Sequence, residues 1–404
     1  MRPLHHVGQH PRGIFNNCIV HLRMMHFCII LVCMMNPFRF GAVVTAADFC
    51  PRPDLVGQLR SCLESRQNVV LLGERRTGKT SLIFETVRRV RGLRLVYAQL
   101  WAVKSVEDVA SRLLRAISTT QVRESSFLER VARSLAYLRP RIEFDPTTGQ
   151  PSITVSPGTK LPPAGLHGVF DFLEELSARH RLVVVLDEFQ DIRQVEDAEA
   201  LLGEIRGRIQ RPGRVPYVFA GSIRHDMELI FRDPSSPFFK SLRTLDVQDL
   251  AREAFQEFLA VRFASGRRRM PDATYDTVFA LAQNNPGDVQ QFCAAVWDVS
   301  SQGETIEGKL IQAALAHVLV TERKGYESQV RRLTSNQVKC LRALARIGGH
   351  RPQSREFLAE AGVALPASAK RALTRLVDLE IIYGPDVDYK FFDPFFKQWV
   401  LKEL

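Results

Sequence analysis

From about Phe49 onward, short apolar runs alternate with longer segments in which apolar residues recur every three or four positions. Compact runs rich in Val, Ile and Leu predict buried strands, whereas the three-to-four periodicity predicts amphipathic helices. Four such runs occupy residues 68–72, 93–100, 182–186 and 215–219. Strands that alternate with helices are typical of an α/β fold with a parallel sheet and crossover helices. We therefore predict this fold class for residues 35–245.

The segments between these runs predict two helices and an insertion. An apolar stripe marks residues 106–117 as a helix, with one face formed by Val106, Val109, Leu113, Leu114 and Ile117. Residues 139–158 place an Asp-Pro-Thr-Thr-Gly stretch before an alternating Ser-Ile-Thr-Val segment. Turn formers followed by alternation predict an inserted β-hairpin. Residues 168–180 predict a second helix.

The second half of the chain is predominantly helical. Residues 249–321 contain three or four amphipathic segments interrupted by an Asn-Asn-Pro-Gly sequence, which predicts a helical lid over residues 246–328. Three more helices are predicted at 333–347, 354–361 and 367–379. A wing with a Gly-Pro-Asp turn is predicted to follow them at 383–392. This order predicts a winged-helix domain over residues 329–404, with the third helix as its recognition element. Packing in the core, rather than base stacking, is expected for Phe391, Phe392, Phe395, Phe396 and Trp399.

Composition narrows the functional classes only a little. The 404 residues are 45% apolar, enough for two or three domains. The formal net charge of +11 favours an acidic partner such as nucleic acid, although the excess is diffuse. The seven cysteines form no Cys-x-x-Cys pair and have no zinc-type spacing. This pattern favours a reducing cytoplasm over a disulfide framework.

The stretch GERRTGKTS at residues 73–81 fits the phosphate-binding pattern G-x-x-x-x-G-K-[ST]. It follows a predicted strand and precedes a predicted helix at 81–90, so backbone N–H groups and the positive end of the helix dipole converge on one point. Lys79 is expected to reach the β- and γ-phosphates, and Thr80 to offer its hydroxyl to Mg²⁺. The loop residues predicted to bind ATP are Gly73, Glu74, Arg75, Arg76, Thr77, Gly78, Lys79, Thr80 and Ser81.

A second motif completes the predicted site. The apolar run 182–186 ends in Asp187 and Glu188. Asp187 is expected to hold the Mg²⁺ ion with its waters, and Glu188 to polarise a water for attack on the γ-phosphate. Two adjacent carboxylates at the end of a buried strand need a cation or a partner, because like charges in a low dielectric repel. The pair therefore predicts hydrolysis, with ATP and Mg²⁺ as ligands.

These motifs, with several others, resemble the prokaryotic archaeal-type ATPases of the AAA-like and STAND branch. The resemblance covers residues 36–404. It rests on NPFRFG (36–41), DFCPRPDLV (48–56), GERRTGKTSL (73–82), VVVLDEFQDI (183–192), AGSIRHDMELIF (220–231), DPSSPFF (233–239), NNP (284–286) and FFDPFFKQWV (391–400). The resemblance implies the additional-strand class of P-loop ATPases, because one strand separates the two nucleotide motifs in sequence.

The resemblance also implies roles for single residues. Phe49 and Arg52 would lie near the adenine, and Pro286 of the lid would border the nucleotide. Ser222, at a strand end, would orient the lytic water, or would simply form a turn or cap a helix. The lid has no clear sensor arginine. Arg224 and Arg243 are candidates for a charge stabiliser, acting within the chain or on a neighbour, but both are better explained as surface residues.

Two functions follow from this combination. One is a molecular switch in which ATP closes core, lid and winged helix together, and hydrolysis through Glu188 resets them. The other is an ATP-regulated DNA-binding or initiator-like protein that contacts duplex DNA through Lys370, Arg371 and Arg375. A non-hydrolysing scaffold is a third option. A protein partner or a homo-oligomer stays open, and a membrane partner is not expected.

The first 34 residues differ from the rest, since they contain no acidic residue and include most of an apolar run of about twelve residues, 24–35. That run is too short to span a bilayer. We favour an over-extended start, with the functional protein beginning at Met34 or Met35. A secretory signal and a genuine anchor or tail remain alternatives, the first disfavoured because an exported protein would find little ATP.

Overall fold

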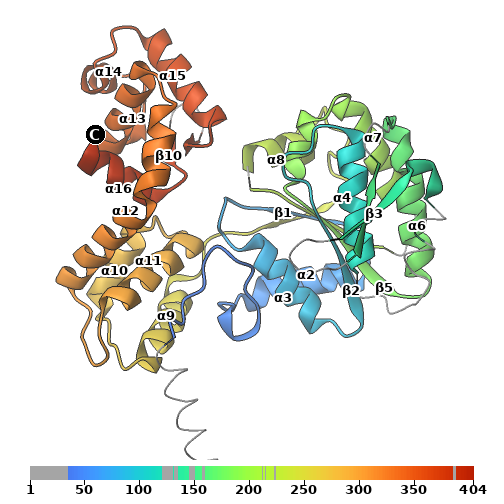
Figure 1. Cartoon of the computed structure of the whole chain (residues 1–404), viewed down its shortest axis with the longest axis horizontal. Coiled ribbons are helices and arrows are strands. Elements are labelled where there is room, and N and C mark those ends of the chain that lie inside the picture. The colour runs from blue at the N-terminus through green and yellow to red at the C-terminus, as the bar shows by residue number, and fades with distance from the viewer. Residues whose placement is uncertain are drawn as a thin grey trace, which may run out of the picture.

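The computed structural model describes residues 35–120, 131, 135–144, 151–156, 160–211, 213, 215–222, 224–384 and 388–404. The predicted extension 1–34, most of the hairpin turn and the tip of the wing lie outside these residues. Figure 1 shows two lobes, an α/β core and an elongated helical lobe that carries the C-terminus. In the part of the chain that the structure describes, no helix is long and apolar enough to cross a membrane.

The core is built on a parallel five-stranded sheet in the order β2-β5-β6-β1-β7. Its strands are β1 (Val69–Leu72), β2 (Leu93–Gln99), β5 (Arg181–Asp187), β6 (Tyr217–Ala220) and β7 (Arg243–Asp246). The four predicted strands and the α/β fold are confirmed, and β2 follows β1 in sequence but lies at the far edge. Strand β6 separates the strand of the phosphate loop from the strand of the carboxylate pair.

Helices cover both faces of the sheet, because alternate strand residues point to opposite sides. Val69, Leu71, Val183 and Val185 pack against α2 (Pro53–Glu64) and α3 (Lys79–Arg89). The other face packs against α4 (Val106–Thr119), α6 (His167–Ser177), α7 (Ala198–Ile209) and α8 (Arg224–Phe231). The predicted stripe of α4 is buried.

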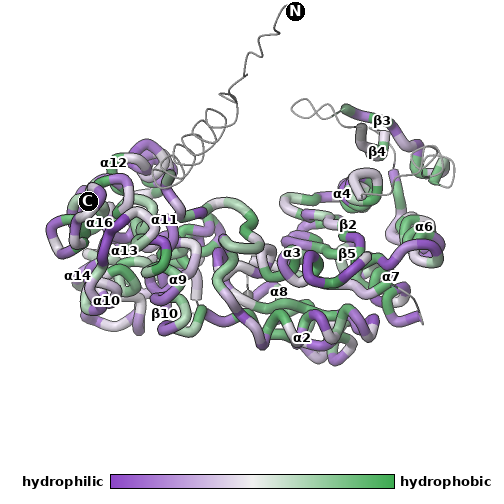
Figure 2. The backbone as a smooth tube through the Cα atoms, turned by 90° about the horizontal axis from the view of Figure 1, so that it is seen from below, coloured by the Kyte–Doolittle hydropathy of each residue, from purple (hydrophilic) through white to green (hydrophobic). Residues whose placement is uncertain are grey.

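The predicted insertion is a hairpin of β3 (Pro140–Phe144) and β4 (Pro151–Val155), paired in antiparallel register. Strand β4 packs on α4, and Figure 2 shows the hairpin at the periphery of the core. Short 3₁₀ helices complete this lobe: η1 (Ala46–Asp48), η2 (Ala136–Leu138), η3 (Pro163–Leu166) and η4 (Phe189–Gln194).

The helical lobe contains the lid and the winged helix. The lid consists of α9 (Arg252–Ser265), α10 (Asp272–Leu281), α11 (Pro286–Val299) and α12 (Gly308–Arg331). The winged helix consists of α13 (Ser335–Ile347), β8 (Gly349–His350), α14 (Arg355–Ala361), α15 (Pro366–Asp378), β9 (Ile382–Tyr383), β10 (Asp388–Phe391) and α16 (Pro394–Glu403). Its strands form an antiparallel sheet in the order β8-β10-β9, as expected of a wing.

One continuous apolar core runs through the lid and the winged helix. Phe292 of α11 stacks on Phe395 of α16 with ring centroids 5.7 Å apart, and Tyr326 of α12 packs against Phe396 and Trp399. The expected burial of the C-terminal aromatic residues is confirmed for Phe391, Phe395, Phe396 and Trp399, whereas Phe392 is half-buried.

Residues 36–50 form a strap from the lid to the core. The Asn36 side chain donates to the carbonyl of Ala294 (3.0 Å) and to Asp298 (2.8 Å), and Phe38 packs against Phe263 and Trp297 of the lid. Farther along the strap, the N–H of Val44 donates to Ser81 at the start of α3. The strap therefore joins the apolar core of the lid to the helix that follows the phosphate loop.

Candidate nucleotide-binding site

The phosphate loop connects β1 to α3 in a conformation that needs two glycines. Gly78 has φ +88°, which a residue with a side chain rarely adopts. Gly73 lies against the backbone of Val247, where a Cβ atom would come within 2.6 Å of the carbonyl oxygen. Arg76 also has a positive φ of 65°. The Thr77 hydroxyl donates to the carbonyl of Glu74 at 2.8 Å and closes the loop on itself.

Lys79 lies inside the loop and is only 6% exposed. Its ammonium donates to the carbonyls of Gly73 (2.9 Å) and Glu74 (2.6 Å). Burial lowers the pKa of Lys79 from 10.5 to about 8, and the charges of Glu188 and Asp187 oppose this fall. A buried ammonium that donates to neutral carbonyls is suited to bind a strong anion at the same point.

Thr80 and Asp187 lie close together at the carboxyl ends of the strands. The Thr80 hydroxyl donates to Oδ2 of Asp187 at 2.8 Å, and the Tyr97 hydroxyl donates to the same oxygen at 2.7 Å. Burial, with the adjacent Asp187 charge, raises the pKa of Tyr97 far above its usual range, so the phenol keeps its proton. Sequence reasoning missed Tyr97, which stands at the expected strand but carries no motif.

Glu188 and Ser222 meet at the ends of neighbouring strands. Glu188 has φ +53°, and its Oε2 atom accepts hydrogen bonds from the Ser222 hydroxyl (2.6 Å) and the Ser222 N–H (3.1 Å). Gln190 donates to the same oxygen at 2.8 Å. Four residues predicted from three separate motifs thus lie together at the carboxyl ends of the strands: Thr80, Asp187, Glu188 and Ser222.

Of the two residues expected near the adenine, Arg52 binds the backbone of the loop and Phe49 lies in the core. Arg52 donates to the carbonyls of Thr77 (2.8 Å) and Gln248 (2.8 Å), so it ties the loop to the segment that enters the lid. Phe49 is 7% exposed and packs in the core between α2 and the sheet. The Ser81 hydroxyl accepts a hydrogen bond from the N–H of Val44 in the strap. Arg243 opens β7 at the opposite end of the strand from the loop.

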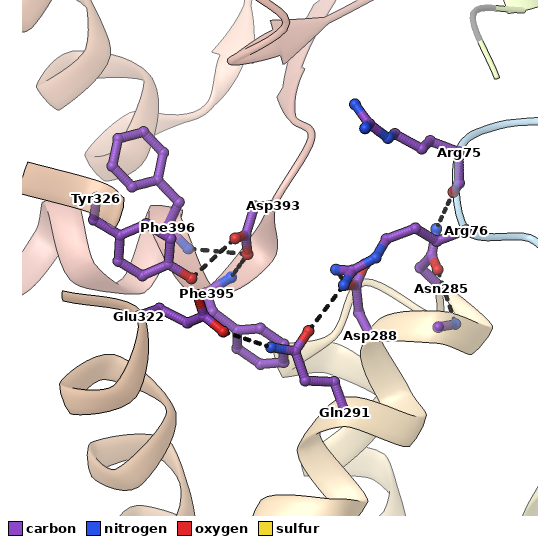
Figure 3. A network of polar contacts seen from close by, with 11 residues as sticks. Arg75, Arg76, Asn285, Asp288, Gln291, Glu322, Tyr326, Asp393, Phe395 and Phe396 are labelled. Atoms are coloured by element: carbon purple, nitrogen blue, oxygen red, sulfur yellow. Dashed lines mark hydrogen bonds and ion pairs between the residues drawn. The ribbon is translucent and has the colours of Figure 1, made fainter. Parts of the chain in front are cut away.

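The lid contacts the phosphate loop directly through the start of α11 (Figure 3). Pro286 is the first residue of α11, and Asn285 caps it, accepting the N–H of Gly287 at 3.1 Å. The Asn285 amide also donates to the carbonyl of Arg75 (2.7 Å), and the N–H of Gly287 donates to that of Arg76 (3.2 Å).

Arg76 extends from the loop into the lid. Its guanidinium bonds to Asp288 and donates to Gln291 at 3.1 Å, and Gln291 donates in turn to Glu322 of α12 (Figure 3). Asp288 is 1% exposed. Burial raises the pKa of Asp288 from 3.8 to about 7, Arg76 opposes the rise, and Asp393 adds to it.

The winged helix also contacts the loop. Arg75 pairs with Glu380 at 2.8 Å, and the Tyr383 hydroxyl donates to Glu74 at 2.7 Å. The predicted ligands Glu74, Arg75 and Arg76 therefore direct their side chains to other parts of the chain, and only their backbone lies in the phosphate cradle.

A cavity of about 760 Å³ opens where core, lid and winged helix meet. It is lined by loop residues, by the segment after β7, by the start of α11 and by aromatic residues of the wing, including Thr77, Gln248, Asn285, Asp288, Tyr383 and Phe392. Its volume is that of a small-molecule site.

The basic residues predicted on the third helix of the winged helix share one face of α15. Lys370, Arg371 and Arg375 are exposed, whereas Ala369, Ala372, Leu373 and Leu376 are buried against the domain. Arg375 lies 3.5 Å from Asp378, a long and exposed ion pair.

Comparison with known proteins agrees with this architecture. Residues 324–402 match a family model described as "Probable winged helix domain". A Walker-type ATPase of Pyrococcus abyssi superposes with a TM-score of 0.59 at 18% identity, over 90% of this chain and 99% of that one. The chain has the fold of a P-loop ATPase with a C-terminal winged helix.

Two other similar structures are the ORC1 protein of Aeropyrum pernix in complex with DNA and a RuvB variant of Thermotoga maritima. The first has a TM-score of 0.49 at 16% identity, over 88% of this chain and 93% of that one. The second has a TM-score of 0.44 at 13% identity, over 85% and 93%. A search of curated proteins found no match.

Proposed function

We propose that the protein binds ATP with Mg²⁺ at the phosphate loop and hydrolyses it. The observation that carries this proposal is the convergence of Lys79, Thr80, Asp187 and Glu188 at the carboxyl ends of two parallel strands, β1 and β5. Open α/β sheets bind their ligands at this edge.

The donor set fits both ligands. Lys79 supplies a buried positive charge for the phosphates, and the loop N–H groups and the start of α3 add to it. The oxygens of Thr80 and Asp187, 2.8 Å apart, would hold Mg²⁺, which prefers oxygen ligands. When bound, Mg²⁺ neutralises charge on the phosphate oxygens.

Glu188 would act as the general base that takes a proton from the attacking water. Ser222 holds one of its carboxylate oxygens from the adjacent strand. We place the nucleoside in the cavity beside the loop, because its volume and its Tyr383 and Phe392 rings suit a base, whereas Phe49 offers little surface.

Replacing Glu188 by Gln tests the chemistry. We expect steady-state phosphate release to fall by about 100-fold or more, with the affinity for a fluorescent ATP analogue unchanged. The matched control is Glu199→Gln, an exposed glutamate on α7, which should keep full turnover. Full turnover in Glu188→Gln would remove hydrolysis from this site.

We further propose that the nucleotide cycle moves the lid and winged helix. The support is that side chains of the phosphate loop contact both, through Arg76 with Asp288 and Arg75 with Glu380. Hydrogen exchange can test this: ATP should change the protection of residues 285–291 and 380–384 in Glu188→Gln. Lys79→Ala, which should not bind ATP, should show no change.

A second candidate function is DNA binding, favoured by the exposed basic face of α15. Replacing Lys370, Arg371 and Arg375 by Ala should weaken binding to duplex DNA and reduce the salt slope by about 2 to 3. Removing three exposed arginines of the core, Arg60, Arg66 and Arg91, is the control for net charge alone. Absence of binding by the unmodified protein at low salt would exclude this function.

A further inference from the structure

Gln190 is a buried amide beside the proposed general base. It lies in η4, two residues after Glu188, and is 4% exposed. Its amide nitrogen lies 2.8 Å from Oε2 of Glu188 and 3.0 Å from Oδ1 of Asp191. Both neighbours are carboxylate acceptors, so the atom that faces them is the NH₂ group, with one proton for each.

The other end of this amide is not satisfied. Within the described residues, the buried Oε1 atom of Gln190 has no hydrogen-bond donor, and it packs so close to Gly221 that a Cβ there would collide with it. A buried acceptor without a donor lowers stability. Packing alone would be served better by an apolar side chain of similar size, so what the glutamine contributes is its two N–H donors.

These donors fix the carboxylate of Glu188 from one side. Ser222 of the strand-end loop binds Oε2 from β6, and Gln190 binds the same oxygen from η4. With three donors on Oε2, the other oxygen of Glu188 is the one with capacity left to accept a proton from a water.

Gln190 is itself held in place. Asp191 is 7% exposed and accepts the N–H of Ala102 at 2.6 Å, in the loop that follows β2. The amide therefore cannot turn away from Glu188 without also breaking its bond to Asp191, which is anchored to the neighbouring strand. The chain from Ala102 through Asp191 and Gln190 ends at the proposed base.

We infer that Gln190 is a positioning residue that orients the carboxylate of Glu188 for hydrolysis. The inference rests on the proposed function, since it assigns Gln190 a role only through Glu188. It predicts that the amide affects the rate of the chemical step and leaves nucleotide binding unchanged.

Gln190→Met keeps the volume of the side chain and removes both donors. We expect kcat to fall by about tenfold or more, less than for loss of Glu188 itself, with the Kd of a fluorescent ATP analogue within about twofold of the unmodified protein. The thermal midpoint should change little, because the loss of two hydrogen bonds to carboxylates is opposed by the removal of a buried, unsatisfied acceptor. The control is Gln194→Met, an exposed glutamine at the end of η4, which should have normal kcat.

A double substitution separates a positioning role from a structural one. If Gln190 acts through Glu188, then Gln190→Met in the Glu188→Gln background should cause no further loss in single-turnover hydrolysis. An additional loss equal to that of the single variant would overturn the inference, as would unchanged kcat or a parallel fall in affinity. Full turnover in Glu188→Gln would instead refute the proposed function, and an inactive Glu188→Gln with a normal Gln190→Met would refute this inference alone.

Discussion

The lid is joined to the winged helix by apolar packing and to the phosphate loop by polar contacts. On the first side, rings such as Phe292, Phe395 and Phe396 share one buried core. On the second, the contacts are the ion pair of Arg76 with Asp288 and the hydrogen bonds of Asn285 and Gly287. Apolar burial is lost whenever a core separates, whereas polar groups exchange their partners for water at a smaller net cost.

The difference indicates which joint would open in the proposed nucleotide-driven movement. The lid and winged helix share a core and should move as one body, with α12 running from one into the other. The polar contacts of the loop should be the ones that open. The same loop is the proposed phosphate site. Nucleotide binding and the movement of the lid with the winged helix would therefore both be controlled at this loop.

The largest effect is expected inside the shared core. Phe395 is fully buried, and Phe395→Ala should destabilise the protein by about 3–5 kcal/mol, because it removes the ring and leaves a cavity. Urea unfolding, followed by a probe in the helical lobe, measures this loss. Leu401→Ala, at a residue of α16 that is 42% exposed, should cost far less. Equal costs would show that the lid and winged helix are not held by this core.

Replacing Arg76 should lower stability less than Phe395→Ala does. It should have a larger effect on the coupling between ATP binding and the winged helix. Arg76→Gln leaves Asp288 buried without its ion pair, and should cost about 1–3 kcal/mol. The ATP-dependent change in hydrogen exchange at residues 380–384 should then be lost, while ATP still binds. If ATP binding were lost instead, the guanidinium would be a phosphate ligand and the polar contact with the lid incidental.

Asp288 should also make stability depend on pH. Its pKa in the folded protein is about 7, above the usual 3.8, so between these values the folded state binds more protons than the unfolded state. The free energy of unfolding should therefore fall as pH rises from about 4 to 7, by at most about 1.4 kcal/mol per pH unit, and then level off. Asp288→Asn should remove this part of the dependence. An unchanged pH profile in Asp288→Asn would show that the carboxyl does not titrate in this range.

The sequence predicts the α/β core better than it predicts the contacts that the phosphate loop makes with the lid and the winged helix. The strands, the loop and the Asp187–Glu188 pair are local patterns, and the structure has the fold that they imply. Strand β7 was missed because only Leu245 of its four residues is buried, which leaves no apolar run. The role of Gln190 could not be predicted from the sequence. The neighbouring residues do not show that its oxygen lacks a hydrogen-bond donor in the folded protein.

Contacts between distant segments could not be predicted from the sequence for another reason. Arg75 and Arg76 are assigned to the nucleotide by the motif around them, yet their side-chain partners lie 305 and 212 residues away. A single sequence carries no signal for such pairs, because any acidic residue of the chain is an equally good partner. The tertiary arrangement decides between them.

The smallest effect is expected at Arg75, which tests whether the two arginines differ. Both members of its pair with Glu380 are about half exposed, so water screens the pair and its contribution to stability should be about 0–1 kcal/mol. Arg75→Ala should thus unfold at nearly the same urea concentration as the unmodified protein, and added salt should change the two alike. A cost as large as that of Arg76→Gln would mean that the winged helix holds the phosphate loop as strongly as the start of α11 does.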